Sequence, residues 1–185
     1  MASNPAERLY VVVSGAPASG KSTLAAALAP ELGLPLLAKD TIKQALLTVL
    51  DVPDVEASRT VGRAAAVALL AVAAEAGSAV LEAPWQRSRA VTELAGLPGR
   101  LVEVFCRCSP ETAAARFAAR AATRDGGHFD HDRTPAELWN DQVAAPVDGG
   151  WPVLVVDTEV PVDVAELADR VRSLARSRPA AGPGR

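Results

Sequence analysis

The sequence predicts an α/β fold in which a central parallel β-sheet is covered by helices on both faces. Short apolar runs rich in β-branched residues alternate along the chain with longer segments whose apolar residues recur at helical spacing. The first run, residues 11–13, leads through a glycine-containing loop directly into a helical pattern. Because ligands bind beyond the carboxyl ends of the strands in such sheets, we expect residues 14–22, 39–41, 83–87 and 158 to surround one crevice.

The loop after the first strand carries a phosphate-binding motif. Residues 15–22 read GAPASGKS, which fits G-x-x-x-x-G-K-[ST] between a strand and a helix. Glycines let the backbone present successive N–H groups to phosphate oxygens, and the helix adds its positive N-terminal end. We expect Lys21 to reach the β- and γ-phosphates of ATP and the Ser22 hydroxyl to ligate Mg²⁺. The predicted nucleotide-binding residues of this loop are Gly15, Ala16, Pro17, Ala18, Ser19, Gly20, Lys21, Ser22 and Thr23.

Apolar periodicity and turn residues place the remaining elements. Strands are expected at about residues 9–14, 34–38, 78–84, 100–106 and 152–157. Helices are expected at about 21–32, 56–76, 87–95 and 163–176, with one more capped by Asp40, one beginning at Ser109 and Pro110, and one from Thr134 to about 145. Residues 1–176 are expected to form a single domain, and residues 177–185 a disordered tail.

Composition narrows the class of protein. The net charge of −3 and the pI near 5.4 disfavour a nucleic-acid partner. No N-terminal run has the form of a signal peptide and no apolar stretch is long and uncharged enough for a membrane span, so we expect a cytoplasmic protein without a membrane partner. Cys106 and Cys108 are interpreted as small apolar fillers at the end of a strand. A monomer and a homodimer both stay open, because the helix at 56–76 could cover the sheet or pair with a second copy.

Five segments are informative when taken together: the phosphate-binding loop, LLAKDTIKQALL around Asp40, EAPW after the third strand, RFAARAATRDGGHFD from Arg116, and a closing VVDT strand. Together they resemble small P-loop kinases of the predicted-kinase (AAA-type ATP-binding domain), chloramphenicol-phosphotransferase and zeta-toxin type. The resemblance implies a three-layer P-loop NTPase fold with five parallel strands in the order 2-3-1-4-5 and a small lid at about 116–133. The segment GHFDHDRTPAELWNDQV also looks like the lid of gluconate kinases, but the acidic, histidine-rich stretch of those enzymes is absent, so gluconate is not carried over.

Asp40 is the predicted catalytic base. In the families that the chain resembles, an aspartate just after the second strand faces the acceptor hydroxyl. A carboxylate at the crevice can accept the proton of that hydroxyl or hold a magnesium-bound water, and helix capping alone is the alternative. Lys43 lies one turn further on and could steer an anionic substrate, although a solvated helix lysine is the plainer interpretation.

Three arginines recur every four residues in the lid segment and share a helix face if the helix continues: Arg116, Arg120 and Arg124. Lid arginines can neutralise the charge that phosphoryl transfer spreads over the equatorial oxygens. Arg116 and Arg120 are the preferred catalytic pair, and Arg120 is also expected to contact the nucleotide. A solvated helix face is the alternative.

The end of the third strand supplies the remaining candidates. Glu82 stands where P-loop proteins hold an acidic residue that orients magnesium, so Glu82 and Ser22 are the predicted metal-site residues. Trp85 could stack on an acceptor and Arg87 could bind it, while a tryptophan packed beside Pro84 is the alternative.

These residues together predict an ATP- and Mg²⁺-dependent kinase that phosphorylates a hydroxyl of a small molecule such as an antibiotic, a sugar or a nucleoside. A nucleoside monophosphate kinase is one alternative, for which Arg59, Arg63 and Arg87 could hold the acceptor phosphate. The other is a nucleotide-hydrolysing switch protein, which would need a water-positioning residue and, for GTP, a base-reading motif.

Overall fold

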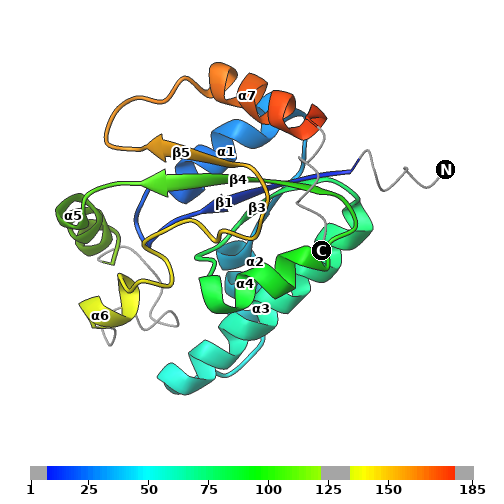
Figure 1. Cartoon of the computed structure of the whole chain (residues 1–185). Helices are drawn as coiled ribbons and strands as arrows, with labels where there is room; N and C mark the ends of the chain where they lie inside the picture. Colours follow the sequence, from blue (N-terminus) through cyan, green and yellow to red (C-terminus); the bar gives the residue numbers. More distant parts are fainter. Residues whose placement is uncertain (1–7, 122–133, 178–185) are drawn as a thin grey trace, which may run out of the picture.

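The elements alternate between strands and helices along nearly the whole chain (Figure 1). The computed structural model describes residues 8–121 and 134–177, apart from the side chains of residues 120, 121, 135 and 137. Strands are β1 (Leu9–Ser14), β2 (Leu36–Ala38), β3 (Ala79–Glu82), β4 (Arg100–Arg107) and β5 (Val153–Asp157). Helices are α1 (Lys21–Leu32), α2 (Lys39–Leu47), α3 (Val55–Ala76), α4 (Arg87–Ala95), α5 (Pro110–Ala121), α6 (Pro135–Leu138) and α7 (Val164–Arg176).

All five strands pair in parallel, in the order β2-β3-β1-β4-β5, which confirms the predicted fold class. Helices α1 and α7 pack on one face of the sheet, and α3 and α4 pack on the other (Figure 1). The central strand β1 shows why both faces are apolar. Val11 and Val13 enter the core with α1 and α7, while Tyr10 and Val12 enter the core with α3 and α4. The carboxyl ends of all the strands therefore meet at one edge.

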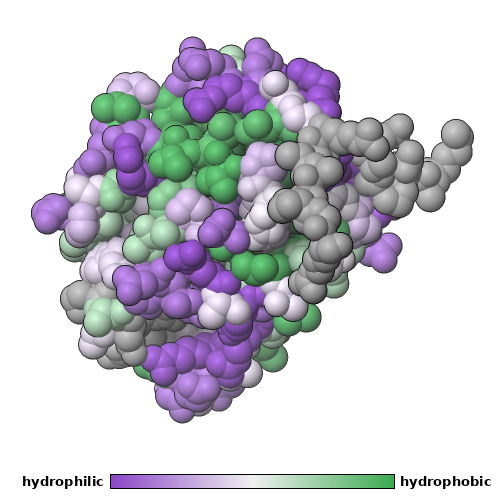
Figure 2. Space-filling view, in the orientation of Figure 1, coloured by the Kyte–Doolittle hydropathy of each residue, from purple (hydrophilic) through white to green (hydrophobic). Residues whose placement is uncertain are grey.

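A buried carboxylate joins the loop before β5 to the start of the P-loop. Glu103 on β4 is fully buried and accepts hydrogen bonds from the Ser14 hydroxyl (2.5 Å), the Val147 N–H (2.9 and 3.1 Å) and Trp151 Nε1 (3.2 Å). These donors satisfy the carboxylate, because buried polar groups need partners. The loop before β5 thus covers Glu103 on β4. The edge strand β5 is less covered: apolar side chains gather at the surface over it, and Val155 is 49% exposed (Figure 2).

Two helix boundaries differ from the predictions. The N-cap of α2 is Ala38, so Asp40 lies inside the first turn and does not cap the helix. Helix α6 ends at Leu138, where the sequence predicts a helix to about 145. The side chain of Asn140 accepts a hydrogen bond from the Gln142 N–H at 2.9 Å. Asparagine competes with helical hydrogen bonding in this way, which accounts for the early end.

Helix α3 corrects the expectation that no stretch of the chain is long and apolar enough to cross a membrane. By length and composition it is the one such helix among the described residues. It buries Val61, Ala65, Leu69 and Ala73 inside the protein, and 28% of its apolar stretch is buried.

The two cysteines have different environments. Cys106 is buried in the core with α1 and α7, and burial raises the pKa of its thiol to about 12, as expected for an apolar filler. Cys108 lies beyond the end of β4 and is partly exposed, so it does not fill the core.

Candidate active site

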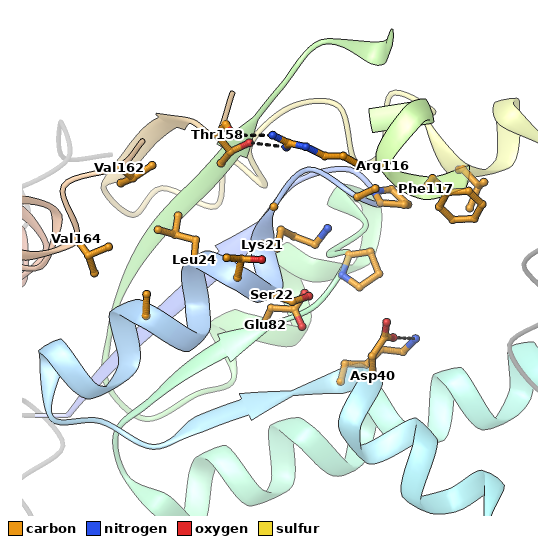
Figure 3. Close-up of a pocket in the computed structure, with 18 of the residues that line it drawn as sticks. Lys21, Ser22, Leu24, Asp40, Glu82, Arg116, Phe117, Thr158, Val162 and Val164 are labelled. Atoms are coloured by element: carbon orange, nitrogen blue, oxygen red, sulfur yellow. Dashed lines mark hydrogen bonds and ion pairs between the residues drawn. The ribbon is translucent and has the colours of Figure 1, made fainter. Parts of the chain in front are cut away.

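A cavity of about 570 Å³ opens at the carboxyl edge of the sheet, where the sequence predicts the crevice (Figure 3). The P-loop forms one side of it, and the first turns of α1 and α2, the end of β3, helix α5 and the segment after β5 form the rest. One end is walled by aliphatic side chains and the other by charged ones. The aliphatic wall consists of Leu24, Ala27, Val160, Val162 and Val164, and the charged end of Lys39, Asp40 and Lys43.

The P-loop backbone has the shape of a phosphate cradle. Gly15, Ala18 and Gly20 all have positive φ angles, of 135°, 61° and 87°. A Cβ on Gly15 would lie 2.5 Å from the carbonyl oxygen of Cys106, and one on Gly20 would lie 3.1 Å from Thr158 Cβ. Only glycine fits such close approaches, so the backbone can fold around an anion.

Two polar side chains of the loop fit a phosphate ligand. Lys21 is 6% exposed, and its ammonium folds back to donate to the Ala16 carbonyl at 2.6 Å. The Ser19 hydroxyl is buried and has no hydrogen-bond partner among the described residues. An orphaned buried hydroxyl is costly, and a ligand with acceptor oxygens would satisfy it.

Ser22 and Glu82 meet at the base of the cavity (Figure 3). The Ser22 hydroxyl lies close enough to the Glu82 carboxylate to lower the pKa of that group, and Glu82 is 5% exposed. Burial raises the pKa of Glu82, the positive charge of Lys21 lowers it, and the negative charge of Asp40 raises it. A buried carboxylate beside a hydroxyl is a donor set that suits Mg²⁺, which prefers oxygen ligands and keeps several waters. The described residues hold no cluster of three or more His, Cys, Asp or Glu that could bind a metal.

Asp40 faces the cavity from the first turn of α2 (Figure 3). Its side chain is 37% exposed, and its Oδ1 pairs with the ammonium of Lys39 at 3.2 Å. The carboxylate is accessible from the cavity and lies near enough to Glu82 to raise the pKa of that group. Lys39 lines the cavity, as expected of the segment 39–41, although the sequence analysis assigns it no role of its own.

Thr158 connects the P-loop to the lid helix. Its hydroxyl donates to the Ser19 carbonyl at 2.8 Å, and its carbonyl accepts from Arg116 Nη2 at 2.9 Å (Figure 3). Arg116 is among the residues that line the cavity. Arg120 lies on α5, but its side chain is outside the described residues, as are Arg124 and most of the predicted lid.

The residue that follows helix α6 contacts the P-loop through its aromatic side chain. Trp139 Nε1 donates to the Pro17 carbonyl at 3.1 Å, and the indole ring meets Phe117 edge-on at a centroid distance of 5.6 Å. This hydrogen bond joins segments 122 residues apart, so the sequence could not indicate it. It fixes the chain on both sides of the lid segment against the nucleotide-binding loop.

The predicted acceptor residues separate into two groups. Lys43 lines the cavity, but it is 2% exposed and is not the solvated lysine that its sequence pattern favours. Trp85 is 5% exposed and packs in the core, where its Nε1 has no hydrogen-bond partner among the described residues. Trp85 and Arg87 are not among the residues that line the cavity.

The arginines of the nucleoside monophosphate kinase alternative are not in the cavity wall. Arg59 and Arg63 lie exposed on α3 and pair with Glu56 of the same helix. Among the described residues, Arg116 is the only arginine that lines the cavity.

Comparisons with known proteins agree with this architecture. The model of the AAA domain family AAA_33 matches residues 11–147. A proposed kinase from Chloroflexus aurantiacus is 31% identical, with a TM-score of 0.80, and the match covers 90% of this chain and 97% of that chain. No curated protein matches the chain in sequence.

More distant solved structures share the fold. A sugar kinase from Janibacter sp. is 22% identical, with a TM-score of 0.57 and coverage of 96% of this chain and 99% of that chain. The APS kinase of Mycobacterium tuberculosis, in complex with AMPPNP and APS, is 20% identical, with a TM-score of 0.59 and coverage of 94% and 100%. The chain therefore belongs to the AAA domain family AAA_33, and its fold is that of the small P-loop kinases.

Proposed function

We propose that this protein is an ATP-dependent kinase that transfers the γ-phosphoryl group to a hydroxyl of a small molecule. The observation that carries the proposal is the joint lining of one cavity by the phosphate-loop residues Lys21 and Ser22 and by the Asp40 carboxylate. Phosphoryl transfer needs little more than positioning and charge stabilisation, which these groups can supply.

The P-loop and the aliphatic wall would hold the nucleotide. The backbone N–H groups around Gly15 and Gly20 face the phosphates, and the Lys21 ammonium leaves the Ala16 carbonyl for the β- and γ-phosphate oxygens. The aliphatic wall offers a flat nucleobase an apolar surface of the kind that ligand pockets use. ATP bound in this way supplies the phosphoryl group.

Ser22 and Glu82 would hold Mg²⁺, which would neutralise negative charge on the phosphates. Ionised Glu82 is the form that binds a cation. Because burial raises the pKa of Glu82, this form is most available when a positive charge is present beside it.

Asp40 would act on the acceptor. Its carboxylate accepts the proton of the attacking hydroxyl while the new O–P bond forms and the bond between the γ-phosphorus and the bridging oxygen breaks, which leaves ADP. Arg116, held by the Thr158 carbonyl, stands where its guanidinium can stabilise the charge on the transferring group. Small-molecule acceptors are supported by relatives such as the sugar kinase and the APS kinase.

An ADP-release assay tests the proposal. Mg·ATP would be combined with a panel of neutral sugars, sugar acids, nucleosides, nucleoside monophosphates and antibiotics. Wild type would be compared with Lys21→Ala and Asp40→Asn. Asp51→Asn is the matched control, because Asp51 is an exposed aspartate that does not line the cavity.

Acceptor-stimulated turnover is expected in wild type and in Asp51→Asn. Loss of the general base is expected to lower kcat in Asp40→Asn by about 10²–10⁴-fold. ATP hydrolysis that no acceptor stimulates, and that Asp40→Asn leaves unchanged, would overturn the proposal and favour the nucleotide-hydrolysing switch.

A further inference from the structure

Thr158, the residue that follows β5, lies against the phosphate loop. Its hydroxyl oxygen is 2.8 Å from the Ser19 carbonyl oxygen and 3.1 Å from the Arg107 carbonyl oxygen. A hydroxyl has one hydrogen to donate, and the Arg107 carbonyl already accepts from the Thr158 N–H at 3.0 Å. The shorter contact is therefore the hydrogen bond, and Thr158 donates its hydroxyl hydrogen to the Ser19 carbonyl.

This hydrogen bond reaches a carbonyl that lies before the helical bonds of α1. The first of those bonds runs from the Leu24 N–H to the Gly20 carbonyl, at 3.0 Å. Ser19 is 1% exposed, and a buried backbone carbonyl needs a donor. The Thr158 side chain supplies that donor and also packs on Gly20, where an added Cβ would lie 3.1 Å from Thr158 Cβ.

The hydrogen bond fixes the direction of the Gly20 N–H. The described residues contain no cis peptide bond, so the C=O and N–H of the Ser19–Gly20 peptide point to opposite sides. Because the Ser19 carbonyl points to Thr158, the Gly20 N–H points away from Thr158. Positive φ angles at Ala18 and Gly20 belong to the turn conformations that aim successive N–H groups at one concave side. The Gly20 N–H is therefore part of the phosphate cradle.

The backbone of Thr158 is held by elements other than the phosphate loop. Its N–H donates to the Arg107 carbonyl of β4, and its carbonyl accepts from Arg116 Nη2 of α5 at 2.9 Å (Figure 3). The next residue, Glu159, accepts from the Ser109 hydroxyl at 2.8 Å, directly before α5. Since β4 and α5 set the place of Thr158, its hydroxyl is a fixed donor to which the loop peptide adjusts.

We infer that Thr158 is a positioning residue of the nucleotide site, whose hydroxyl orients the Ser19–Gly20 peptide so that the Gly20 N–H faces the phosphates. The inference rests on the nucleotide binding of the proposed function, and not on the acceptor or on Asp40. Thr158 lies 139 residues from Ser19 along the chain. Its carbonyl holds Arg116, so the lid arginine and the Gly20 N–H are placed by the same residue.

Two substitutions separate the hydroxyl from the rest of the side chain. Thr158→Val keeps nearly the same shape and removes the donor, whereas Thr158→Ser keeps the donor and removes the methyl group. Thr60→Val is the matched control, because the exposed Thr60 hydroxyl also donates to a backbone carbonyl, that of Glu56 at 3.1 Å, outside the cavity. Calorimetry would measure the affinity of each variant for Mg·AMPPNP and for Mg·tripolyphosphate, which has three phosphates and neither a base nor a ribose.

Thr158→Val is expected to weaken the binding of both ligands by about tenfold or more, because hydrogen bonds to charged groups are the stronger class. Thr158→Ser and Thr60→Val should bind both ligands as wild type does. The unfolding temperature without ligand would be measured for every variant. A lower unfolding temperature of Thr158→Val with unchanged affinities would show a structural role alone and overturn the inference.

Three other results would also overturn it. Thr158→Val that binds both ligands as wild type does would leave the proposed function standing without the inference. Weaker binding of Mg·AMPPNP alone would mean that Thr158 contacts the base or the ribose. Equal losses in Thr158→Val and Thr158→Ser would assign the effect to the methyl group on Gly20. Wild type that binds neither ligand would overturn the proposed function, and the inference with it.

Discussion

Substituting Gly15 tests the geometry of the phosphate loop most directly. Gly15 has a φ angle of 135°, a backbone region that residues with a Cβ rarely adopt. A Cβ there would also lie 2.5 Å from the carbonyl oxygen of Cys106 and 2.7 Å from Ser19 Oγ. The carbonyl belongs to β4, which pairs with β1, so it cannot move away without disturbing the sheet.

The magnitude follows by comparison with Gly33, the C-cap of α1. Gly33 also has a positive φ angle, of 68°, but nothing lies within 4 Å of its Cβ position. Gly33→Ala therefore carries only the cost of the left-handed conformation, about 1–2 kcal/mol. Gly15→Ala adds the overlap with Cys106 to a backbone cost of about 1–3 kcal/mol, so its total should exceed about 3 kcal/mol.

Urea unfolding of wild type, Gly15→Ala and Gly33→Ala would give the free energies of unfolding, and calorimetry would give the affinity for Mg·AMPPNP. We expect Gly33→Ala to bind the nucleotide normally and Gly15→Ala to lose both stability and nucleotide binding. If Gly15→Ala is no less stable than Gly33→Ala and binds the nucleotide as wild type does, Gly15 does not lie as close to the Cys106 carbonyl of β4 as the structure indicates.

Two further predictions concern charged groups of the cavity. In magnesium-free buffer near neutral pH, Glu82→Gln should unfold at a higher temperature than wild type, because burial raises the pKa of Glu82 and its ionised form therefore disfavours folding. This difference in unfolding temperature between Glu82→Gln and wild type should shrink as the pH falls through the raised pKa toward the ordinary value of 4.5. Thermal unfolding measured at several pH values would contradict the raised pKa of Glu82 if the difference stayed constant. Arg116→Ala should lower kcat for the acceptor found in the ADP-release assay by about 10²–10³-fold, as loss of a preorganised donor does, with a smaller change in KM. An unchanged kcat would remove Arg116 from the catalytic groups.

The sequence predicted the site best where the functional residues are close to one another along the chain. The P-loop could be predicted because its glycines, Lys21 and Ser22 lie within one short segment between a strand and a helix. The place of Asp40 at the crevice followed from chain order, since it comes directly after a strand of the parallel sheet. Its capping role was wrong, because the backbone enters α2 two residues earlier than the pattern suggests.

Contacts between distant segments were not accessible from the sequence. Lys43 has the pattern of a solvated helix lysine, and only the packing of α2 on α3 shows that Ser58 receives its ammonium. Trp85 follows a strand end as a site residue would, yet it turns into the core with α4. In both cases the environment is supplied by a different helix, whose placement local periodicity does not encode.

The order of strands and helices, the phosphate loop and the edge of the sheet at which the cavity opens could all be predicted from the sequence, because periodicity and short motifs are local properties of the chain. Which charged side chains share the cavity could be seen only in the folded structure. The pairing of Lys39 with Asp40, the burial of Lys43 and the link from Arg116 through Thr158 to Ser19 depend on packing between segments far apart in the chain.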